Sequence, residues 1–219
     1  MHGVSNDHLS AVVFDLGAVL IDWDPRYVYR DLFPDEVEME AFLADVTSTT
    51  WNHQLDAGRS WADAVAELVA THPGHRDLIE AYWTRWSDML RGEIPGTVAV
   101  LQELRDAGAR LFALTNWSAE TFPIARERFD FLGWFEGIVV SGEEGLAKPD
   151  PGIYRILLER YAIDPVAALF VDDRQENVAA ALAAGMDGVV FTSPGTLRDD
   201  LVARGLLDAA PAARPTDAS

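Results

Sequence analysis

The chain has 219 residues, of which 49% are apolar, no cysteine and a formal net charge of −19. This composition excludes disulfides, thiolate metal sites and cysteine catalysis, and it argues against nucleic acid or anionic membranes as partners, because both attract clustered positive charge. With no apolar run of about 18 residues and no visible secretory signal, we expect a cytoplasmic globular protein of one domain, with room for a modest insert.

The first predicted element is a buried strand that ends at a carboxylate. Residues 12–20 read Val-Val-Phe-Asp-Leu-Gly-Ala-Val-Leu, so Asp15 follows a short apolar run. Such a run is typical of a central parallel strand covered on both faces, and open α/β sheets bind ligands at the carboxyl ends of their strands. An unpaired buried carboxylate is unfavourable, so we expect a cationic partner for Asp15.

The next part of the chain is predicted to be a helical cap over residues 21–92. Asp22-Trp23-Asp24-Pro25 is expected to form a turn, with Asp24 as a helix cap and Pro25 at the first helical position. Residues 47–58 are polar and indicate a loop. Apolar residues recur at spacings of three and four, which predicts helices, in residues 26–33, 35–46, 60–70 and 75–89.

From residue 93 onward the pattern alternates between strand and helix, which indicates a parallel sheet with right-handed crossovers. We therefore predict an α/β fold, a doubly wound parallel sheet made of residues 1–20 and 93–207, with Ser118 capping one helix. The tail, residues 208–219, has no periodic apolar face and is expected to be disordered. Strands are predicted at 110–114, 137–140, 167–171 and 188–191, and helices at 96–107, 118–129, 151–161, 175–184 and 196–203.

Four of the predicted strands lead into polar residues. Asp15, Thr115-Asn116 and Asp172-Asp173 follow their strands directly, and Lys148, the single lysine among 17 basic residues, lies one loop beyond another strand. Each segment alone is also typical of a turn, a helix cap or a solvated loop. Because the carboxyl ends of parallel strands share one edge, we expect the four to converge into a site for a divalent cation and a phosphoryl group.

These segments together resemble the four ordered motifs of the haloacid dehalogenase superfamily of hydrolases, most of which are phosphatases. The resemblance covers residues 11–207 and includes a helical cap of the C1 type between the first and second motifs. It implies a Rossmann-like core and a Mg²⁺-dependent phosphatase that acts on a small phosphorylated metabolite. The matching segments are Asp15 to Leu20, Thr115-Asn116, Lys148 to Pro151 and Phe170 to Asp173.

The resemblance implies catalytic and phosphate-binding roles for the matching residues. Asp15 would attack phosphorus and form an aspartyl-phosphate, and Lys148 would pair with Asp15 and the phosphate. The phosphate oxygens would be bound by Thr115, by the amide of Asn116 and by the turn at Leu16 and Gly17.

The resemblance also implies a Mg²⁺ site and contacts from the cap. Asp15, the main-chain carbonyl of Gly17 and Asp173 would hold the metal, with Asp172 acting directly or through water. Further candidates for substrate contact lie in the cap, although packing is the favoured interpretation of Trp51, and Trp117 is open to both interpretations. The cap candidates are Trp51, Asn52, Asp56 and Arg59.

Gly17 departs from the family pattern. Phosphatases of the superfamily usually carry a second Asp two residues after the nucleophile, as general acid and base, and such help is worth about 10²–10⁴-fold. The same departure occurs in a sugar-phosphate branch of the glucose-1-phosphate type, whose anomeric phosphate leaves more readily. Asp22 and Asp24 are candidates for replacing the missing acid, although capping of the first cap helix is the favoured reading.

Two other functions stay open at this point. Dehalogenases of the superfamily also lack the second Asp, but a metal-free reaction on carbon has no use for Asp172 and Asp173, and the aromatic residue expected at position 17 is absent. A binding or regulatory protein, disabled by Gly17, is the other alternative. The sequence does not indicate the oligomeric state.

Overall fold

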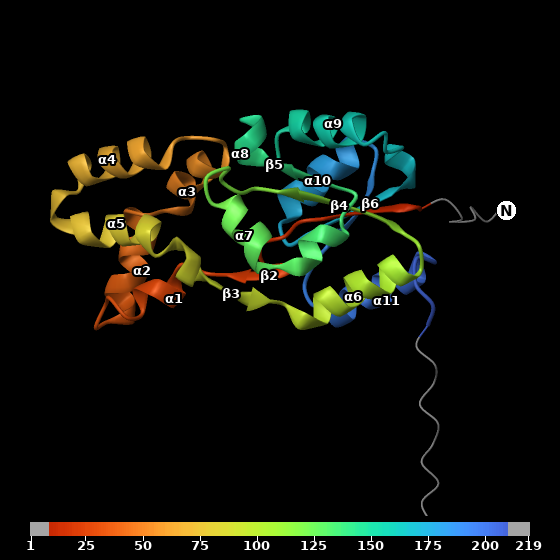
Figure 1. Cartoon of the computed structure of the whole chain (residues 1–219), viewed down its shortest axis with the longest axis horizontal. Helices are drawn as coiled ribbons and strands as arrows, with labels where there is room; N and C mark the ends of the chain where they lie inside the picture. Colours follow the sequence, from red (N-terminus) through yellow and green to blue (C-terminus); the bar gives the residue numbers. More distant parts are fainter. Residues whose placement is uncertain (1–8, 210–219) are drawn as a thin grey trace, which may run out of the picture.

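A five-stranded parallel sheet forms the centre of the computed structural model, which describes residues 9–209 (Figure 1). The strand order is β5-β4-β1-β6-β7, and every neighbouring pair is parallel. The predicted doubly wound α/β fold is therefore confirmed. The strands are β1 (Ala11–Phe14), β4 (Arg110–Thr115), β5 (Gly137–Val140), β6 (Ala168–Asp172) and β7 (Asp187–Val190).

The central strand β1 stands at the point where the sheet changes direction. From β1 the chain builds β4 and β5 on one side and then returns to build β6 and β7 on the other. Phe14 pairs with Ala113 of β4 and with Val171 of β6. Ligands bind at such switch points, outside the carboxyl ends of the strands. Asp15, the residue after β1, therefore lies where this fold is built to hold a ligand.

Helices cover both faces of the sheet. In β1, Val12 and Phe14 pack into one hydrophobic cluster and Val13 into another, and all three are fully buried. Each such side chain stabilises the fold by about 1.5–3 kcal/mol. Figure 1 shows α6 (Pro95–Asp106) and α11 (Pro194–Ala203) on one side of the sheet, with α9 (Pro151–Arg160) and α10 (Gln175–Ala183) on the other. Two shorter helices, α7 (Phe122–Arg128) and α8 (Ser141–Glu144), follow β4 and β5.

The segment expected to be a cap, residues 21–92, is mostly helical and lies beside the sheet (Figure 1). Its interior is aromatic: the rings of Trp51, Trp61 and Tyr82 are buried and pack against one another at centroid distances of 5.3–6.0 Å. Its helices are α1 (Arg26–Tyr29), α2 (Glu36–Asp45), α3 (Thr49–Asp56), α4 (Trp61–Thr71) and α5 (Arg76–Thr84).

An antiparallel pair of short strands joins this segment to the sheet. β2 (Ile21–Trp23) pairs with β3 (Leu90–Glu93), with an irregularity between Asp22 and Trp23. The chain therefore enters and leaves the helical segment at neighbouring points. We propose to divide the protein there, with residues 21–92 as the cap and residues 1–20 and 93–207 as the core.

Several local predictions were wrong. Residues 47–58 contain the helix α3, because Ser48 accepts a hydrogen bond from the N–H of Trp51 and caps it, while Trp51 and Leu55 bury one face. The predicted turn at residues 22–25 begins as strand β2, and Pro25 precedes α1 instead of starting it.

Ser118 does not cap α7, which begins at Phe122; its hydroxyl instead accepts the indole N–H of Trp61. Most of the tail predicted to be disordered lies outside the described residues. Within residues 9–209, no helix has the length and apolar character needed to cross a membrane.

Candidate active site

The carboxylates of Asp15 and Asp172 share one buried ammonium. Lys148 Nζ lies 2.9 Å from Asp15 Oδ1 and 2.7 Å from Asp172 Oδ2, and Lys148 is only 1% exposed. Asp15 follows β1, Lys148 follows α8 beyond β5, and Asp172 is the last residue of β6. The parallel sheet therefore brings together side chains that are far apart in the sequence. The cationic partner expected for Asp15 is the single lysine of the chain.

Main-chain contacts fix this triad in place. The N–H of Asp15 donates to the carbonyl of Val171 at 2.8 Å, and the N–H of Leu16 donates to Asp15 Oδ1 at 2.7 Å. Asn177 Nδ2 donates to both oxygens of Asp172, at 2.9 and 3.1 Å. With Lys148 also bound, the Asp172 carboxylate is well satisfied, which a buried charge requires.

Asn116 holds Lys148 through its main chain. Its side-chain Nδ2 donates to the carbonyl of Lys148 at 2.9 Å, and its Oδ1 accepts the N–H of Lys148 at 2.8 Å. The side-chain amide of Asn116 is therefore occupied in fixing the lysine. The phosphate contact expected for the amide of Asn116 stays a prediction.

Burial and charge shift the pKa values of the cluster. Burial raises the pKa of Asp15 to about 7, with Lys148 lowering it and Asp172 raising it further. Burial and the neighbouring Asp172 also raise the pKa of Asp173. Burial lowers the pKa of Lys148, but Asp15 and Asp172 outweigh that effect and the net shift is upward. The Lys148 ammonium therefore stays charged, but its single positive charge does not neutralise the carboxylates around it.

The acidic residues of the cluster suit a hard divalent cation. Asp15, Asp172 and Asp173 each offer an oxygen, and these oxygens all lie within 4.8 Å of one another. Set against the one ammonium of Lys148, the three carboxylates leave a formal charge of −2. Oxygen ligands of this kind are those that Mg²⁺ prefers. Asp173 is exposed and Asp172 is buried, so the two differ in their access to an ion.

Thr115, at the end of β4, is 1% exposed, and within residues 9–209 its Oγ1 has no hydrogen-bond partner. A buried hydroxyl without a partner is unfavourable, and an oxygen-rich ligand at this edge would relieve that cost. Gly17 follows Asp15 and Leu16 in the turn after β1, and a Cβ added to Gly17 would meet nothing within 4 Å. Space therefore exists where the family's second Asp side chain would project.

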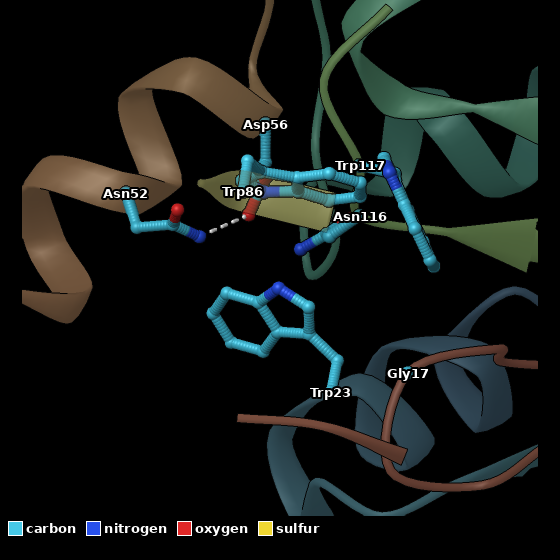
Figure 2. A pocket seen from close by; sticks show the side chains of 7 residues that line it. All are labelled: Gly17, Trp23, Asn52, Asp56, Trp86, Asn116 and Trp117. Atoms are coloured by element: carbon cyan, nitrogen blue, oxygen red, sulfur yellow. Dashed lines mark hydrogen bonds between the residues drawn. The ribbon is translucent and has the colours of Figure 1, made fainter. Parts of the chain in front are cut away.

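A pocket opens beside this cluster, between the core and the cap (Figure 2). It measures about 60 Å³, enough for a few water molecules, since one water needs roughly 10–15 Å³ by this measure. The walls are Gly17, Trp23, Asn52, Asp56, Trp86, Asn116 and Trp117.

Two of the four cap candidates line the pocket. Asn52 and Asp56 lie on α3, and Asn52 Nδ2 donates to Asp56 Oδ2 at 2.9 Å, as the dashed line in Figure 2 shows. The other two, Trp51 and Arg59, lie elsewhere, and for Trp51 this agrees with the favoured packing interpretation. Trp51 is buried in the aromatic interior of the cap, and Arg59 pairs with Glu67 on the protein surface; neither lines the pocket.

The pocket also contains residues that the sequence analysis missed or left open. Trp23 and Trp86 were not among the candidates, because they come from β2 and from the short 3₁₀ helix η2 (Trp86–Met89), whose positions depend on the β2–β3 pairing. Trp117 lines the pocket and also packs edge-on against Trp86 at 5.6 Å. The Thr-Asn-Trp run after β4 was the available signal for Trp117.

Neither sequence candidate for the missing acid lies in the pocket. Asp24 accepts the N–H of Arg26 at 2.8 Å, so it caps the start of α1 as the favoured reading predicted. Asp22 accepts the hydroxyl of Tyr27 at 2.8 Å. Both carboxylates are thus occupied by contacts within the cap and its connecting strand.

Comparisons with known proteins identify relatives over most of the chain. A family model described as haloacid dehalogenase-like hydrolase matches residues 9–185. The sesquiterpene phosphatase of Aspergillus oryzae is 31% identical over 185 residues, covering 83% of this chain and 89% of that protein. A phosphorylated carbohydrates phosphatase of Thermotoga maritima is 23% identical, over 83% of this chain and 84% of that one.

Solved structures share the fold. A haloacid dehalogenase family enzyme from Bacteroides thetaiotaomicron, in complex with magnesium and inorganic phosphate, superposes with a TM-score of 0.62 at 21% identity, over 84% of this chain and 94% of that one. The L-2-haloacid dehalogenase of Xanthobacter autotrophicus gives a TM-score of 0.60 at 20% identity, over 89% and 83%. At these identities the likeness concerns the fold alone.

Proposed function

Since the chain belongs to the haloacid dehalogenase-like hydrolases, we propose that it is a Mg²⁺-dependent phosphatase that hydrolyses phosphate monoesters through Asp15. The observation that carries the proposal is the cluster of Asp15, Asp172 and Asp173 around the buried Lys148. A net formal charge of −2 at a strand edge suits a divalent cation, and a cation beside a nucleophilic carboxylate suits phosphoryl transfer.

In the proposed reaction the Asp15 carboxylate attacks phosphorus and the ester oxygen leaves as the alcohol. Water then attacks the aspartyl-phosphate, and the Asp15 carboxylate is regenerated as inorganic phosphate forms. Lys148, fixed by Asn116, orients Asp15 and offers positive charge to the phosphoryl oxygens. The hydroxyl of Thr115 supplies a donor to the same oxygens.

Asp15, Asp173 and the carbonyl of Gly17 would hold Mg²⁺, with Asp172 acting directly or through water. When bound, the ion neutralises negative charge on the carboxylates and on the phosphoryl group. Asp172 is more constrained than Asp173, because its oxygens already accept from Lys148 and Asn177. We therefore expect Asp173 to contribute the more available oxygen.

The alternatives fit these observations less well. Dehalogenation needs a nucleophilic carboxylate but no metal, and it leaves the third carboxylate, Asp173, without a use. A binding protein without activity would need the proton-transfer step to be lost, but Asp56 supplies a carboxyl group to the pocket that Gly17 lines.

The walls of the pocket bear on the alcohol part of the substrate. Trp23, Trp86 and Trp117 offer apolar ring surface, and the polar wall residues other than Asn116 are Asn52 and Asp56. A sugar has many hydroxyls that need partners, whereas an isoprenoid chain needs apolar surface. We propose a small phosphorylated metabolite with an apolar alcohol, as the 31% identical relative's name suggests, with the sugar-phosphate prediction as the alternative.

The proposal predicts release of inorganic phosphate that requires Mg²⁺. The purified chain would be assayed with p-nitrophenyl phosphate, farnesyl phosphate and glucose 1-phosphate, with and without EDTA. Asp15→Asn should lower turnover at least about 10³-fold, because it removes the nucleophile. Asp130→Asn, at an exposed carboxylate in the core, is the matched control and should leave turnover unchanged.

Two results would contradict the proposal. Equal turnover in Asp15→Asn and the unsubstituted chain would remove Asp15 from the reaction. Release of chloride from 2-chloropropionate in EDTA, with no release of phosphate from any ester, would assign the chain to dehalogenation. The preferred ester of the panel separates the isoprenoid proposal from the sugar-phosphate prediction.

A further inference from the structure

Asp56 lies in the same pocket as the glycine that replaces the family's usual acid. Gly17 forms one wall and leaves open space beside its Cα, whereas Asp56 reaches that pocket from the end of α3 in the cap. Figure 2 shows the Asp56 carboxylate among the side chains of Asn52, Trp86 and Asn116. A carboxyl group is therefore present in the pocket although position 17 does not provide one.

Contacts from both parts of the protein fix Asp56. Tyr82 Oη donates to Asn52 Oδ1 at 3.2 Å, and Asn52 Nδ2 donates to Asp56 Oδ2 at 2.9 Å, so α5 and α3 orient the side chain. The hydroxyl of Ser141, which follows β5 in the core, donates to the main-chain carbonyl of Asp56. Asp56 is thus presented to the site when the cap sits on the core.

A carboxylate is an unsuitable wall for a pocket that receives a phosphate dianion, because like charges repel. A carboxylic acid has no such conflict and can donate a proton. Burial and the nearby Asp15 raise the pKa of Asp56 to about 7, with Lys148 and the Ser118 N–H acting in the opposite direction. Near neutral pH both forms are populated, which suits a group that first gives and then takes a proton.

We propose that Asp56 is the general acid and base of this enzyme, supplied by the cap in place of the side chain that Gly17 lacks. The inference rests on the proposed phosphatase function. As the Asp15 oxygen bonds to phosphorus, the bond from phosphorus to the ester oxygen breaks, and the Asp56 proton passes to that oxygen to give the alcohol.

In the second step Asp56 acts as the base. Its carboxylate takes a proton from water as the water oxygen bonds to phosphorus. The bond between phosphorus and Asp15 breaks, and its electron pair returns to the Asp15 carboxylate. The products are inorganic phosphate, a free Asp15 and a protonated Asp56, so the enzyme is ready for the next substrate.

The test compares two esters that differ in their need for an acid. An alkyl phosphate expels an alkoxide that must be protonated, whereas p-nitrophenolate leaves without a proton. Asp56→Asn keeps an oxygen to accept from Asn52 and should lower kcat about 10²–10⁴-fold on the alkyl phosphate and much less on p-nitrophenyl phosphate. Asp63→Asn, at an exposed carboxylate on α4, is the matched control and should change neither.

The pH profile and a rescue variant sharpen the test. For the unsubstituted chain, kcat/KM on the alkyl phosphate should fall as pH rises through about 7, and Asp56→Asn should remove that limb. The charged or titratable groups that face Asp56 are Asp15 and Lys148 of the core and Tyr82 of α5. Gly17→Asp in the Asp56→Asn background should restore part of the lost turnover.

A thermal measurement provides a readout independent of activity. Asp56 binds its proton more tightly in the folded than in the unfolded chain, so its ionisation destabilises the fold as pH rises from about 4 to 7. The change in Tm caused by Asp56→Asn should therefore be a few degrees more positive at pH 8 than at pH 5. An equal effect at both pH values would count against the inference.

The outcomes separate this inference from the proposed function. Equal losses of turnover on both esters in Asp56→Asn would show that Asp56 has a structural role. A selective loss on the alkyl phosphate in Asp24→Asn would assign the acid to Asp24. Either result overturns the inference, while Asp15→Asn still tests the proposed phosphatase function. If the unsubstituted chain hydrolyses no phosphate ester, both the function and the inference fail.

Discussion

Lys148 shows how much of the site depends on a single side chain. Its ammonium is buried between Asp15 and Asp172, and Asn116 fixes its main chain from two sides. Buried ion pairs contribute little net stability when intact, because both partners lose water, but loss of one partner leaves the others unpaired. The lysine is therefore needed for the fold as well as for the proposed chemistry.

Lys148→Met should lower the free energy of unfolding by about 3–5 kcal/mol, because two carboxylates would stay buried without their cation. The loss should be larger at pH 8 than at pH 5. The pKa of Asp15 is already raised to about 7, and without Lys148 it rises further, so ionisation above neutral pH destabilises the fold.

Urea denaturation at both pH values measures this change. Arg160→Met is a suitable control, because Arg160 forms a partly exposed pair with Glu144 and should cost no more than about 1 kcal/mol. If both variants lost the same stability at both pH values, the charge argument for Lys148 would not hold.

At the residue scale the sequence predicted the central triad but not the whole pocket. Asp15, Lys148 and Asp172 were predictable because strand ends converge whatever the loops do. Asp56 was named as a possible substrate contact, but its relation to Gly17 depends on how α3 sits against the core, and no local pattern encodes that placement. The position of Arg59 could not be predicted for the same reason, because Arg59 pairs with Glu67 of the next helix, α4.

At the scale of elements, the loop after β4 and the helix α8 form the surface on which the cap rests. Ser118 accepts the indole N–H of Trp61 at 2.9 Å, and Ser141 donates to the carbonyl of Asp56. Gly142 allows α8 to approach the loop, and its N–H donates to the carbonyl of Trp117 at 3.1 Å. The spacing between the loop and α8 therefore sets the position of Asp56.

Gly142→Ala should separate α8 from the loop after β4. The added Cβ would lie 2.8 Å from the carbonyl oxygen of Trp117 and would also collide with the main-chain nitrogen of Ala119. Because both contacts are with backbone, we expect a loss of about 1–3 kcal/mol in the free energy of unfolding and a fall in kcat.

Chemical denaturation and the alkyl phosphate assay measure the two effects. Gly133→Ala is the matched control, since a Cβ at Gly133 meets nothing within 4 Å and should change stability little. Full stability and activity in Gly142→Ala would mean that α8 and the loop after β4 tolerate a wider spacing than this structure indicates.

Most strands and helices of the core were predictable to within a few residues, whereas the short helix α8 and three elements of the cap region were not. The core strands are continuous apolar runs with clear ends, such as Gly137–Val140. Helix α3 has only two buried apolar residues, Trp51 and Leu55, and β2 and β3 are short strands stabilised mainly by each other. Periodicity is weak where pairing between distant segments decides the structure.

At the scale of the whole molecule, the formal charge of −19 opposes the approach of a phosphate ester. Local positive charge at Lys148 must attract the substrate against a field that extends over the Debye length, about 30 Å at 0.01 M salt and 10 Å at 0.1 M. Association with a dianion is then slower at low ionic strength.

We therefore expect kcat/KM for a phosphate ester to rise by roughly several-fold when sodium chloride is increased from about 10 to about 100 mM at constant Mg²⁺, because salt screens the repulsion between the protein and the ester. Steady-state assays in sodium chloride and in potassium acetate would separate screening from effects of a particular ion. A fall in kcat/KM with both salts would show that the local field of the site outweighs the net charge.

The pairing of β2 with β3 has a consequence for how this protein changes over evolutionary time. Ile21 pairs with Glu93 and Trp23 with Leu90, so both ends of the inserted polypeptide meet at a fixed spacing. An insertion of different length would satisfy the same spacing, because the entropy of closing a loop grows slowly with its length. Exchange of the segment between these two strands would therefore change the pocket walls and remove Asp56 together, while leaving Asp15, Lys148 and Asp172 in place at the sheet edge.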